Sequence, residues 1–197
     1  MPVRLWLLRH AHTDWNRVGK IQGRKDQPID ERARVHLSGL RLPQAAADAL
    51  LVASPLSRAV ETARLVGRRQ PQIADELIEM DWGAWEGRHG VDLLAEPGPG
   101  YRHIEEWGWD FEPPGGETPA QVWLRLQPFV SSLRQPTLAV THIGVMRVLL
   151  AQATGWNFEG VPPFSVKRDR LYGIDVHPDG SLAFDGAPVR LIASESP

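Results

Sequence analysis

The sequence predicts an α/β fold, with helices covering both faces of a mostly parallel sheet. Three short apolar runs, at 3–8, 49–53 and 137–141, are typical of strands buried in such a sheet. Each run is followed along the chain by a segment whose apolar residues have helical spacing. Because strands that alternate with helices form parallel sheets, we expect a three-layer α/β/α sandwich.

The predicted helices have start signals in the sequence. Asp30 is suited to cap a helix over 31–40. Thr118 can cap a helix that runs to about Arg134, with a kink expected at Pro128. Two further helices are predicted over 58–68 and 144–153.

The end and the middle of the chain differ from this alternating pattern. Segments 171–176 and 182–184 are joined by Pro178-Asp179-Gly180, which predicts a hairpin that adds antiparallel strands to the sheet. Residues 88–116 are rich in glycine, proline, aromatic and acidic residues. We expect a single domain over 1–197, in which 88–116 is an excursion with one or two short helices that covers the active site.

Composition excludes several classes of protein. The chain has 197 residues, 42% hydrophobic content and a net charge of −2, which does not favour nucleic-acid binding. With no cysteine it has neither a disulfide framework nor a thiolate nucleophile. No apolar stretch is long enough to cross a membrane, and no signal peptide is recognisable. We therefore expect a cytoplasmic protein without a nucleic-acid or membrane partner; its oligomeric state is not predicted.

Basic and polar residues follow all three predicted parallel strands. Arg9-His10 ends the first strand, Ser54 to Arg58 follows the second, and Thr141-His142 ends the third. The carboxyl ends of parallel strands meet at one edge of the sheet, where such folds bind ligands. Arginine matches phosphate oxygens with a planar pair of donors, and an imidazole can attack phosphorus. The pattern predicts a phosphoryl-transfer site with a histidine nucleophile.

Phosphoryl transfer to the histidine releases an alkoxide, which needs a proton. Glu79 is the candidate acid, because the apolar residues around it would raise its pKa. Asp81, Glu76 and Glu86 are the alternatives for this role.

Five motifs in order resemble those of the histidine phosphatase superfamily, in its phosphoglycerate-mutase-like branch. They cover nearly the whole chain, which implies the three-layer fold of that family. They are Arg9-His10-Ala11 with Trp15-Asn16 and Gln22-Gly23, the block Ser54 to Ala63, the block Glu79 to Gly87, Pro114 to Thr118, and Thr141-His142-Ile143-Gly144-Val145.

The resemblance implies a role for each of five residues. His10 would be the nucleophile that becomes phosphohistidine. Arg9, Arg58 and His142 would hold the phosphoryl group, and Glu79 would donate a proton and later accept one from water. Neither a metal nor an organic cofactor is implied, and the partner would be a phosphorylated small molecule.

The resemblance also implies a phosphate-contacting loop. At two other positions the sequence differs from the family's motifs. Asn16 and Gly23 match the loop, with Gln22 beside them. Ala11 and Ile143 stand where the family commonly has glycine. A side chain there would be costly if the backbone had positive φ or approached phosphate closely, and Ile143 would narrow the pocket or select smaller substrates.

The short chain favours a phosphatase over a mutase. Mutases of the family are longer and have Tyr-Gly-x-Leu-Gln-Gly where this chain has Trp82 to Gly87. The tryptophan-rich block, with Trp107 and Trp109, also resembles α-ribazole phosphatases of cobalamin assembly. The favoured function is hydrolysis of a small phosphomonoester, with mutase-type phosphotransfer and α-ribazole phosphate hydrolysis as alternatives.

Two other classes remain as alternatives. His10, His12 and His142 could instead be ligands of a zinc hydrolase, although Arg9 and Arg58 would then have no role. Ala11 and Ile143 are compatible with a family member that binds phosphate without turnover, although a binder needs no proton donor. Outside the site, we expect Glu117 and Arg125 to form a structural ion pair.

Overall fold

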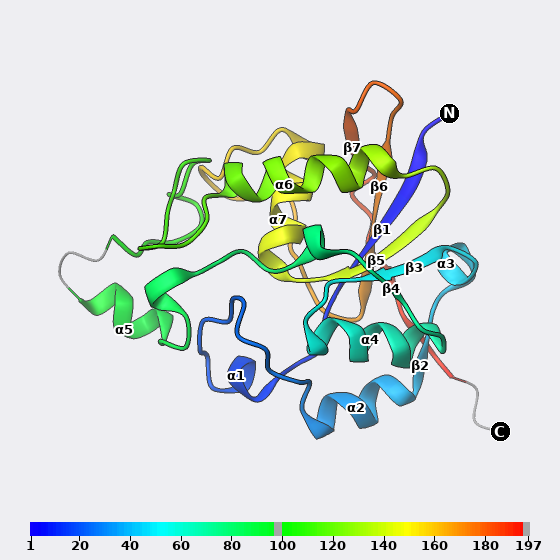
Figure 1. Ribbon diagram of the computed structural model, residues 1–197, viewed down its shortest axis with the longest axis horizontal. Helices are drawn as coiled ribbons and strands as arrows, with labels where there is room; N and C mark the ends of the chain where they lie inside the picture. The colour runs from blue at the N-terminus through cyan, green and yellow to red at the C-terminus, as the bar shows by residue number, and fades with distance from the viewer. Residues whose placement is uncertain (97–99, 195–197) are drawn as a thin grey trace.

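The computed structural model describes residues 1–96 and 100–194 and has a central seven-stranded sheet (Figure 1). Its strand order is β4-β3-β5-β1-β6-β7, and β8 pairs with β6. The strands are β1 (Val3–Arg9), β3 (Leu50–Ala53), β4 (Gln72–Ile73), β5 (Thr137–Thr141), β6 (Arg170–Val176), β7 (Leu182–Phe184) and β8 (Val189–Arg190). A separate two-stranded sheet joins β2 (Leu40–Arg41) to β9 (Ile192–Ala193).

The pairing of strands confirms the mostly parallel sheet. β1, β3, β4 and β5 are parallel to one another, whereas β6 is antiparallel to β1 and pairs with β7 and β8 as antiparallel neighbours. The predicted hairpin is therefore present at the antiparallel side of the sheet.

Helices cover both faces of the sheet (Figure 1), as expected. α6 (Pro119–Ser132) and α7 (Ile143–Thr154) lie on one face, and α2 (Glu31–Ser38) and α4 (Ser57–Gly67) lie on the other. Alternate residues of β1 belong to the two cores, Leu5 and Leu7 to the first and Trp6 and Leu8 to the second. Burial of both strand faces explains why this strand is a continuous apolar run.

The caps that the sequence predicts are formed. The Asp30 side chain accepts the N–H of Ala33, and Thr118 forms a capping box with Gln121. α2 ends at Ser38, two residues before the predicted end, because Leu40 enters β2. α6 contains Pro128 and continues to Ser132.

The structure also contains elements that were too short to produce a periodic pattern. They are α1 (Asp14–Arg17), α3 (Gln44–Ala47), two 3₁₀ turns at Asp75–Leu77 and Gly83–Trp85, and the two-residue strands. α5 (Gly90–Ala95) is the short helix expected within 88–116 (left in Figure 1). In the described part of the chain, no helix is both long and apolar enough to span a membrane.

Candidate active site

The sheet register brings the three predicted strand ends together. Arg9 is paired with Thr141 between β1 and β5, and the ladder continues one residue further, where the His10 N–H donates to the Thr141 carbonyl at 2.9 Å. On the other side of β5, the Ser54 N–H donates to the Val140 carbonyl at 3.0 Å. The predicted convergence of His10, Ser54 and His142 at one sheet edge follows directly from this register.

The hydrogen bonds of His10 define its tautomer. The ring Nδ1 lies 2.6 Å from the Ala11 carbonyl oxygen. A carbonyl only accepts, so Nδ1 carries the proton and the Nε2 lone pair is available. Burial lowers the pKa of His10 well below its ordinary value, and the nearby His142, Arg58 and Arg9 add to this effect. The ring is therefore held neutral, as a nucleophile requires.

The second histidine is fixed behind the first. The His142 ring centroid lies 5.1 Å from that of His10. The Arg58 Nε–H donates to His142 Nδ1 at 3.2 Å, so Nε2 carries the proton and donates to the Ser54 hydroxyl at 2.7 Å. Burial, with Arg58 as the largest nearby charge, lowers the pKa of His142 well below its ordinary value.

Arg58 is fully buried and ties the loop after α1 to this edge. Its guanidinium donates to the carbonyls of Gly23 at 2.6 Å and Lys25 at 3.1 Å. The Gly23 N–H in turn donates to Glu86 at 3.0 Å. In this structure Arg58, His142 and Gly23 lie behind the cavity wall, where they support the residues that line it.

Two buried donors beside His10 have no partner within the described residues: Nε of Arg9 and Nε2 of Gln22. The Gln22 carbonyl oxygen accepts from Thr13 and Asn16, which fixes the orientation of its amide. Burial and the nearby Arg168 lower the pKa of Arg9 to about 9, so it stays cationic at neutral pH. An unpartnered buried donor costs roughly 1–3 kcal/mol, a cost that a functional role of these two residues would explain.

Glu79 lines the same cavity as His10 and is almost completely buried. Its two carboxylate oxygens accept the backbone N–H groups of Met80 at 2.8 Å and Gly144 at 3.2 Å. Burial raises the pKa of Glu79 above its ordinary value, and these two N–H groups oppose the shift only in part. The carboxyl group is therefore suited to carry a proton.

The three alternative acids are placed elsewhere. Asp81 accepts the Gly83 N–H, and Glu86 accepts the N–H groups of Gly23 and Lys25. Glu76 lines a different groove, between β4 and α6. Of the four carboxylates considered, Glu79 is the one that lines the cavity with His10.

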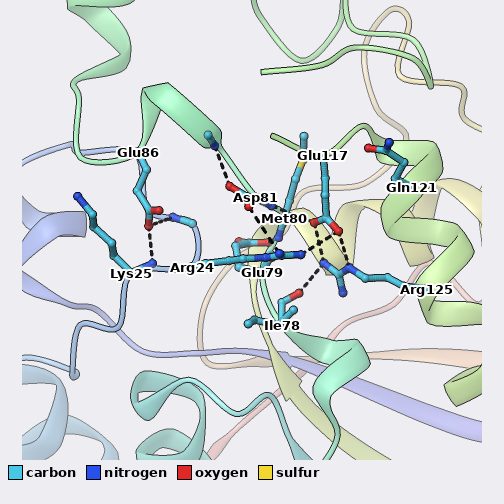
Figure 2. A network of polar contacts seen from close by, with 12 residues as sticks. Arg24, Lys25, Ile78, Glu79, Met80, Asp81, Glu86, Glu117, Gln121 and Arg125 are labelled. Carbon is cyan, nitrogen blue, oxygen red and sulfur yellow. Dashed lines mark hydrogen bonds and ion pairs between the residues drawn. The ribbon is translucent and has the colours of Figure 1, made fainter. Parts of the chain in front are cut away.

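A network of ion pairs holds the segment that carries Glu79 (Figure 2). Glu117 lies between two guanidiniums, 2.9 Å from Arg24 and 3.0 Å from Arg125. Arg125 donates to the backbone carbonyls of Ile78 and Glu76, and Arg24 donates to the carbonyl of Glu79. The predicted structural ion pair of Glu117 and Arg125 is confirmed. Arg125 holds the chain before Glu79, and Glu117 holds it after Glu79 by accepting the Asp81 N–H at 3.0 Å.

The two departures from the family's glycines cause no backbone strain. Neither Ala11 nor Ile143 is among the residues with positive φ. The Ala11 N–H donates to the Thr62 hydroxyl at 3.0 Å, and its methyl group is buried in the core. Ile143 begins α7, and its side chain lines the cavity. The glycine that this turn requires is the next residue, Gly144, where a Cβ would lie 2.5 Å from Glu79 Oε1.

A Gly144→Ala substitution is therefore expected to displace the Glu79 carboxylate. We expect kcat for an alkyl phosphate to fall by about tenfold or more, and stability to fall by roughly 1–3 kcal/mol from overpacking. Steady-state kinetics and thermal unfolding would measure both effects. Gly39→Ala is the matched control, because a Cβ there meets its nearest atom at an ordinary 3.5 Å. An unchanged kcat in Gly144→Ala would contradict this placement of Glu79.

The cavity has a volume of about 540 Å³. The predicted residues Arg9, His10, Asn16, Gln22, Glu79 and Ile143 all line it. Residues from the 88–116 segment also line it, among them Val91, Leu94, Tyr101, Ile104 and Trp107. Positions 97–99 of that segment lie outside the described residues.

Sequence reasoning missed two arginines at the site. Arg168, which precedes β6, donates to the carbonyl of His10 at 3.1 Å and to Asn16 Oδ1 at 2.8 Å. No motif marks this residue. Arg147 also lines the cavity, and its position four residues after Ile143 on a predicted helix was the signal that could have identified it.

The contacts of His142 argue against the zinc-hydrolase hypothesis. Arg58 donates to one of its ring nitrogens, and the other is hydrogen-bonded to Ser54. Over 1–96 and 100–194, no three or more histidine, cysteine, aspartate or glutamate side chains are grouped so that they could hold a metal ion.

Comparison with known proteins agrees with the geometry. The chain is 34% identical to the adenosylcobalamin/α-ribazole phosphatase of Escherichia coli (strain K12) over 187 residues, covering 89% of this chain and 91% of that protein. The fold matches the structure of mycobacterial hydrolase 1 with a TM-score of 0.79 at 25% identity, over 98% of this chain and all of that one. It also matches a phosphoglycerate mutase from Thermus thermophilus with a TM-score of 0.73 at 29% identity, over 98% and 100% of the two chains.

The family model of the histidine phosphatase superfamily (branch 1) matches residues 5–183. This range contains all five motifs and every residue predicted for the site. The chain belongs to the histidine phosphatase superfamily, branch 1.

Proposed function

We propose that this protein hydrolyses a small phosphomonoester through a phosphohistidine on His10. The observation that carries the proposal is the neutral His10 ring, whose Nδ1–H is bound to the Ala11 carbonyl while Nε2 keeps its lone pair. The ring lines a cavity together with the cationic Arg9 and with Gln22, whose amide is oriented by Thr13 and Asn16. A nucleophile beside preorganised donors is what phosphoryl transfer requires.

The reaction has two steps. In the first, His10 Nε2 attacks phosphorus, the P–O bond to the leaving group breaks, and Glu79 gives its proton to the departing alkoxide. In the second, the Glu79 carboxylate takes a proton from water, the water oxygen attacks phosphorus, and the P–N bond breaks. Phosphate leaves, and both His10 and the protonated Glu79 are restored.

The other residues have supporting roles in this proposal. Arg9 and Gln22 bind the phosphoryl oxygens. Arg58 fixes the loop through the Gly23 carbonyl, and it holds the His142 ring behind the nucleophile. Described residues of the 88–116 segment contribute to the cavity wall, which supports the prediction that this segment covers the active site. A single domain and a cytoplasmic location stay predictions from the sequence.

The alternative functions differ from this proposal in the phosphoryl acceptor, in the substrate or in the absence of turnover. In a mutase the acceptor is a substrate hydroxyl, whereas the proposed reaction uses water. Hydrolysis of α-ribazole phosphate is supported by the likeness to the Escherichia coli protein and by the apolar side chains of Trp82, Ile104 and Trp107 in the cavity wall. A binder without turnover has less support, because Ala11 and Ile143 leave the backbone unstrained and Glu79 is held as a buried acid.

Turnover of 4-nitrophenyl phosphate tests the proposal. Because no step uses a metal, we expect its rate to be the same after exhaustive treatment with EDTA. Rapid acid-free quenching with ³²P-labelled substrate should trap label that is stable to base and labile to acid, as a phosphoramidate is, on the peptide that contains His10. Loss of activity with EDTA that a divalent metal restores would refute the mechanism. Conversion of 3-phosphoglycerate to 2-phosphoglycerate without phosphate release would identify a mutase.

A further inference from the structure

Arg147 is a cation in the cavity wall that the proposed reaction does not use. It lies on α7 four residues after Ile143, so the two side chains are neighbours on one helix face, and both line the cavity. Within the described residues, its guanidinium has neither a hydrogen bond nor an ion pair. Burial lowers the pKa of Arg147 from its ordinary value, and the charges of Glu79, Glu105 and Tyr101 oppose this shift.

The other cations of the cavity wall already have partners or a role. Arg102 lies over the Phe111 ring at 5.2 Å and donates to the Trp107 carbonyl. Lys20 lies over the ring of Trp15 at 5.6 Å. Arg9 is beside the nucleophile. Among the lysine and arginine residues that line the cavity in the described part of the chain, Arg147 is thus the one with neither a ring contact nor a hydrogen-bond partner, apart from Arg9 beside the nucleophile.

Tyr101 provides a second donor near Arg147. Its hydroxyl has no hydrogen-bond partner in the part of the chain that the structure describes. Its ring packs edge-on against Trp85 at 5.1 Å, which fixes the phenol in the cavity wall. Both residues line the cavity, so both donor groups are available to an acceptor on a ligand, and the cation favours an anion.

Arg147 lies where the main cavity adjoins a smaller one. Together with Ile104, Glu105 and Ile143, it also lines a neighbouring cavity of about 180 Å³, whereas Arg9 and His10 line only the main one. A ligand group that reaches Arg147 from the side of the smaller cavity would be a part of the substrate other than the phosphate that His10 attacks. One guanidinium and one phenol match the two oxygens of a carboxylate.

We propose that Arg147 and Tyr101 form a subsite for a carboxylate on the leaving group. This rests on the proposed phosphatase function and names its substrate class, the phosphate esters of hydroxy acids. The similar proteins leave this point open, because α-ribazole has no carboxylate and phosphoglycerate has one. Glu105 also lines the cavity, and its charge acts on Arg147.

A matched pair of substrates isolates the carboxylate. 3-Phosphoglycerate and glycerol 3-phosphate differ in having a carboxylate or a hydroxymethyl group at the same carbon. We expect the protein to prefer 3-phosphoglycerate by roughly 10- to 100-fold in kcat/KM, the effect of a charge-assisted hydrogen-bonded pair. Phosphoserine and phosphoethanolamine form a second pair with the same expected preference. Equal kcat/KM within both pairs would overturn the subsite.

Variants of Arg147 and Tyr101 test whether these two residues cause the preference for the ester that has a carboxylate. Arg147→Gln should abolish the preference while it leaves kcat/KM for glycerol 3-phosphate within about threefold, and Arg147→Lys should retain part of it. Tyr101→Phe should reduce it by about three- to tenfold. Arg64→Gln, an exposed arginine of α4, is the control for the loss of one positive charge. An equal loss on both members of a pair in Arg147→Gln would place Arg147 at the phosphoryl group instead and refute the proposal.

Binding measurements test the carboxylate subsite independently of phosphate hydrolysis. In the His10→Ala variant, calorimetry should find tighter binding of 3-phosphoglycerate than of glycerol 3-phosphate, and the difference should vanish on adding Arg147→Gln. A difference in binding without turnover by the unmodified protein would refute the proposed function and leave the subsite standing. Equal binding of the two esters would refute the subsite, whatever the activity.

Discussion

Replacing His10 with alanine is expected to reduce kcat for phosphomonoester hydrolysis by roughly 10⁴-fold or more. The reaction divides into two steps only because an unprotonated imidazole nitrogen attacks phosphorus. That nitrogen is Nε2, since Nδ1 donates to the Ala11 carbonyl. Alanine removes the attacking atom but leaves Arg9, Gln22 and Glu79 in place, so the variant should still bind phosphate esters.

Two measurements complete this test. Loss of 4-nitrophenyl phosphate turnover should coincide with loss of the trapped ³²P label. His12→Ala is the matched control, because His12 lies two residues along the chain and is not among the residues that line the cavity. Full activity of His10→Ala would end the phosphohistidine mechanism.

Glu79→Gln is expected to have the second largest effect, about 10²- to 10⁴-fold on kcat for an alkyl phosphate. An alkoxide is a poor leaving group unless it is protonated, and glutamine has no proton of that acidity to give. 4-Nitrophenolate needs no proton to leave. With 4-nitrophenyl phosphate we therefore expect a rapid burst of nitrophenol followed by slow turnover, because glutamine also fails to activate water in the second step.

The burst is the decisive readout for Glu79. Glu76→Gln is the control, since that side chain belongs to the groove between β4 and α6. Equal losses on alkyl and aryl phosphates, without a burst, would show that Glu79 supports the fold of the site and not proton transfer.

The pH dependence of hydrolysis follows from the two pKa shifts. Burial lowers the pKa of His10, so the nucleophile stays neutral when the pH falls well below the ordinary histidine pKa of 6.5. Burial raises the pKa of Glu79 above 4.5, so the acid stays protonated to higher pH than a free glutamate. For an alkyl phosphate, we expect kcat/KM to persist on the acid side and to fall as pH rises through the Glu79 pKa. The Glu79→Gln variant should lack this alkaline decline.

Local patterns in the sequence determined the sheet and the location of the site. The apolar run of β1 is continuous because both of its faces are buried, and the same pattern recurs at β3 and β5. Because parallel strands end at one edge, the residues after these strands had to meet, and Glu79 was recognisable from its apolar neighbours. The short elements outside these apolar runs and the hairpin, such as β4 and α1, were not predictable, since they have only two to four residues and no apolar pattern of their own.

The tertiary structure alone decided the chemical state of that site. The tautomer of His10 depends on the Ala11 carbonyl, and the need for glycine at 144 depends on Glu79, 65 residues away. Arg168 enters the site through the packing of a distant segment, which places it against His10 and Asn16. Strand and helix periodicity is encoded by neighbours along the chain and can be read from the sequence. Hydrogen bonds and close contacts between distant segments have no such local pattern, because they are set by the packing of the whole fold.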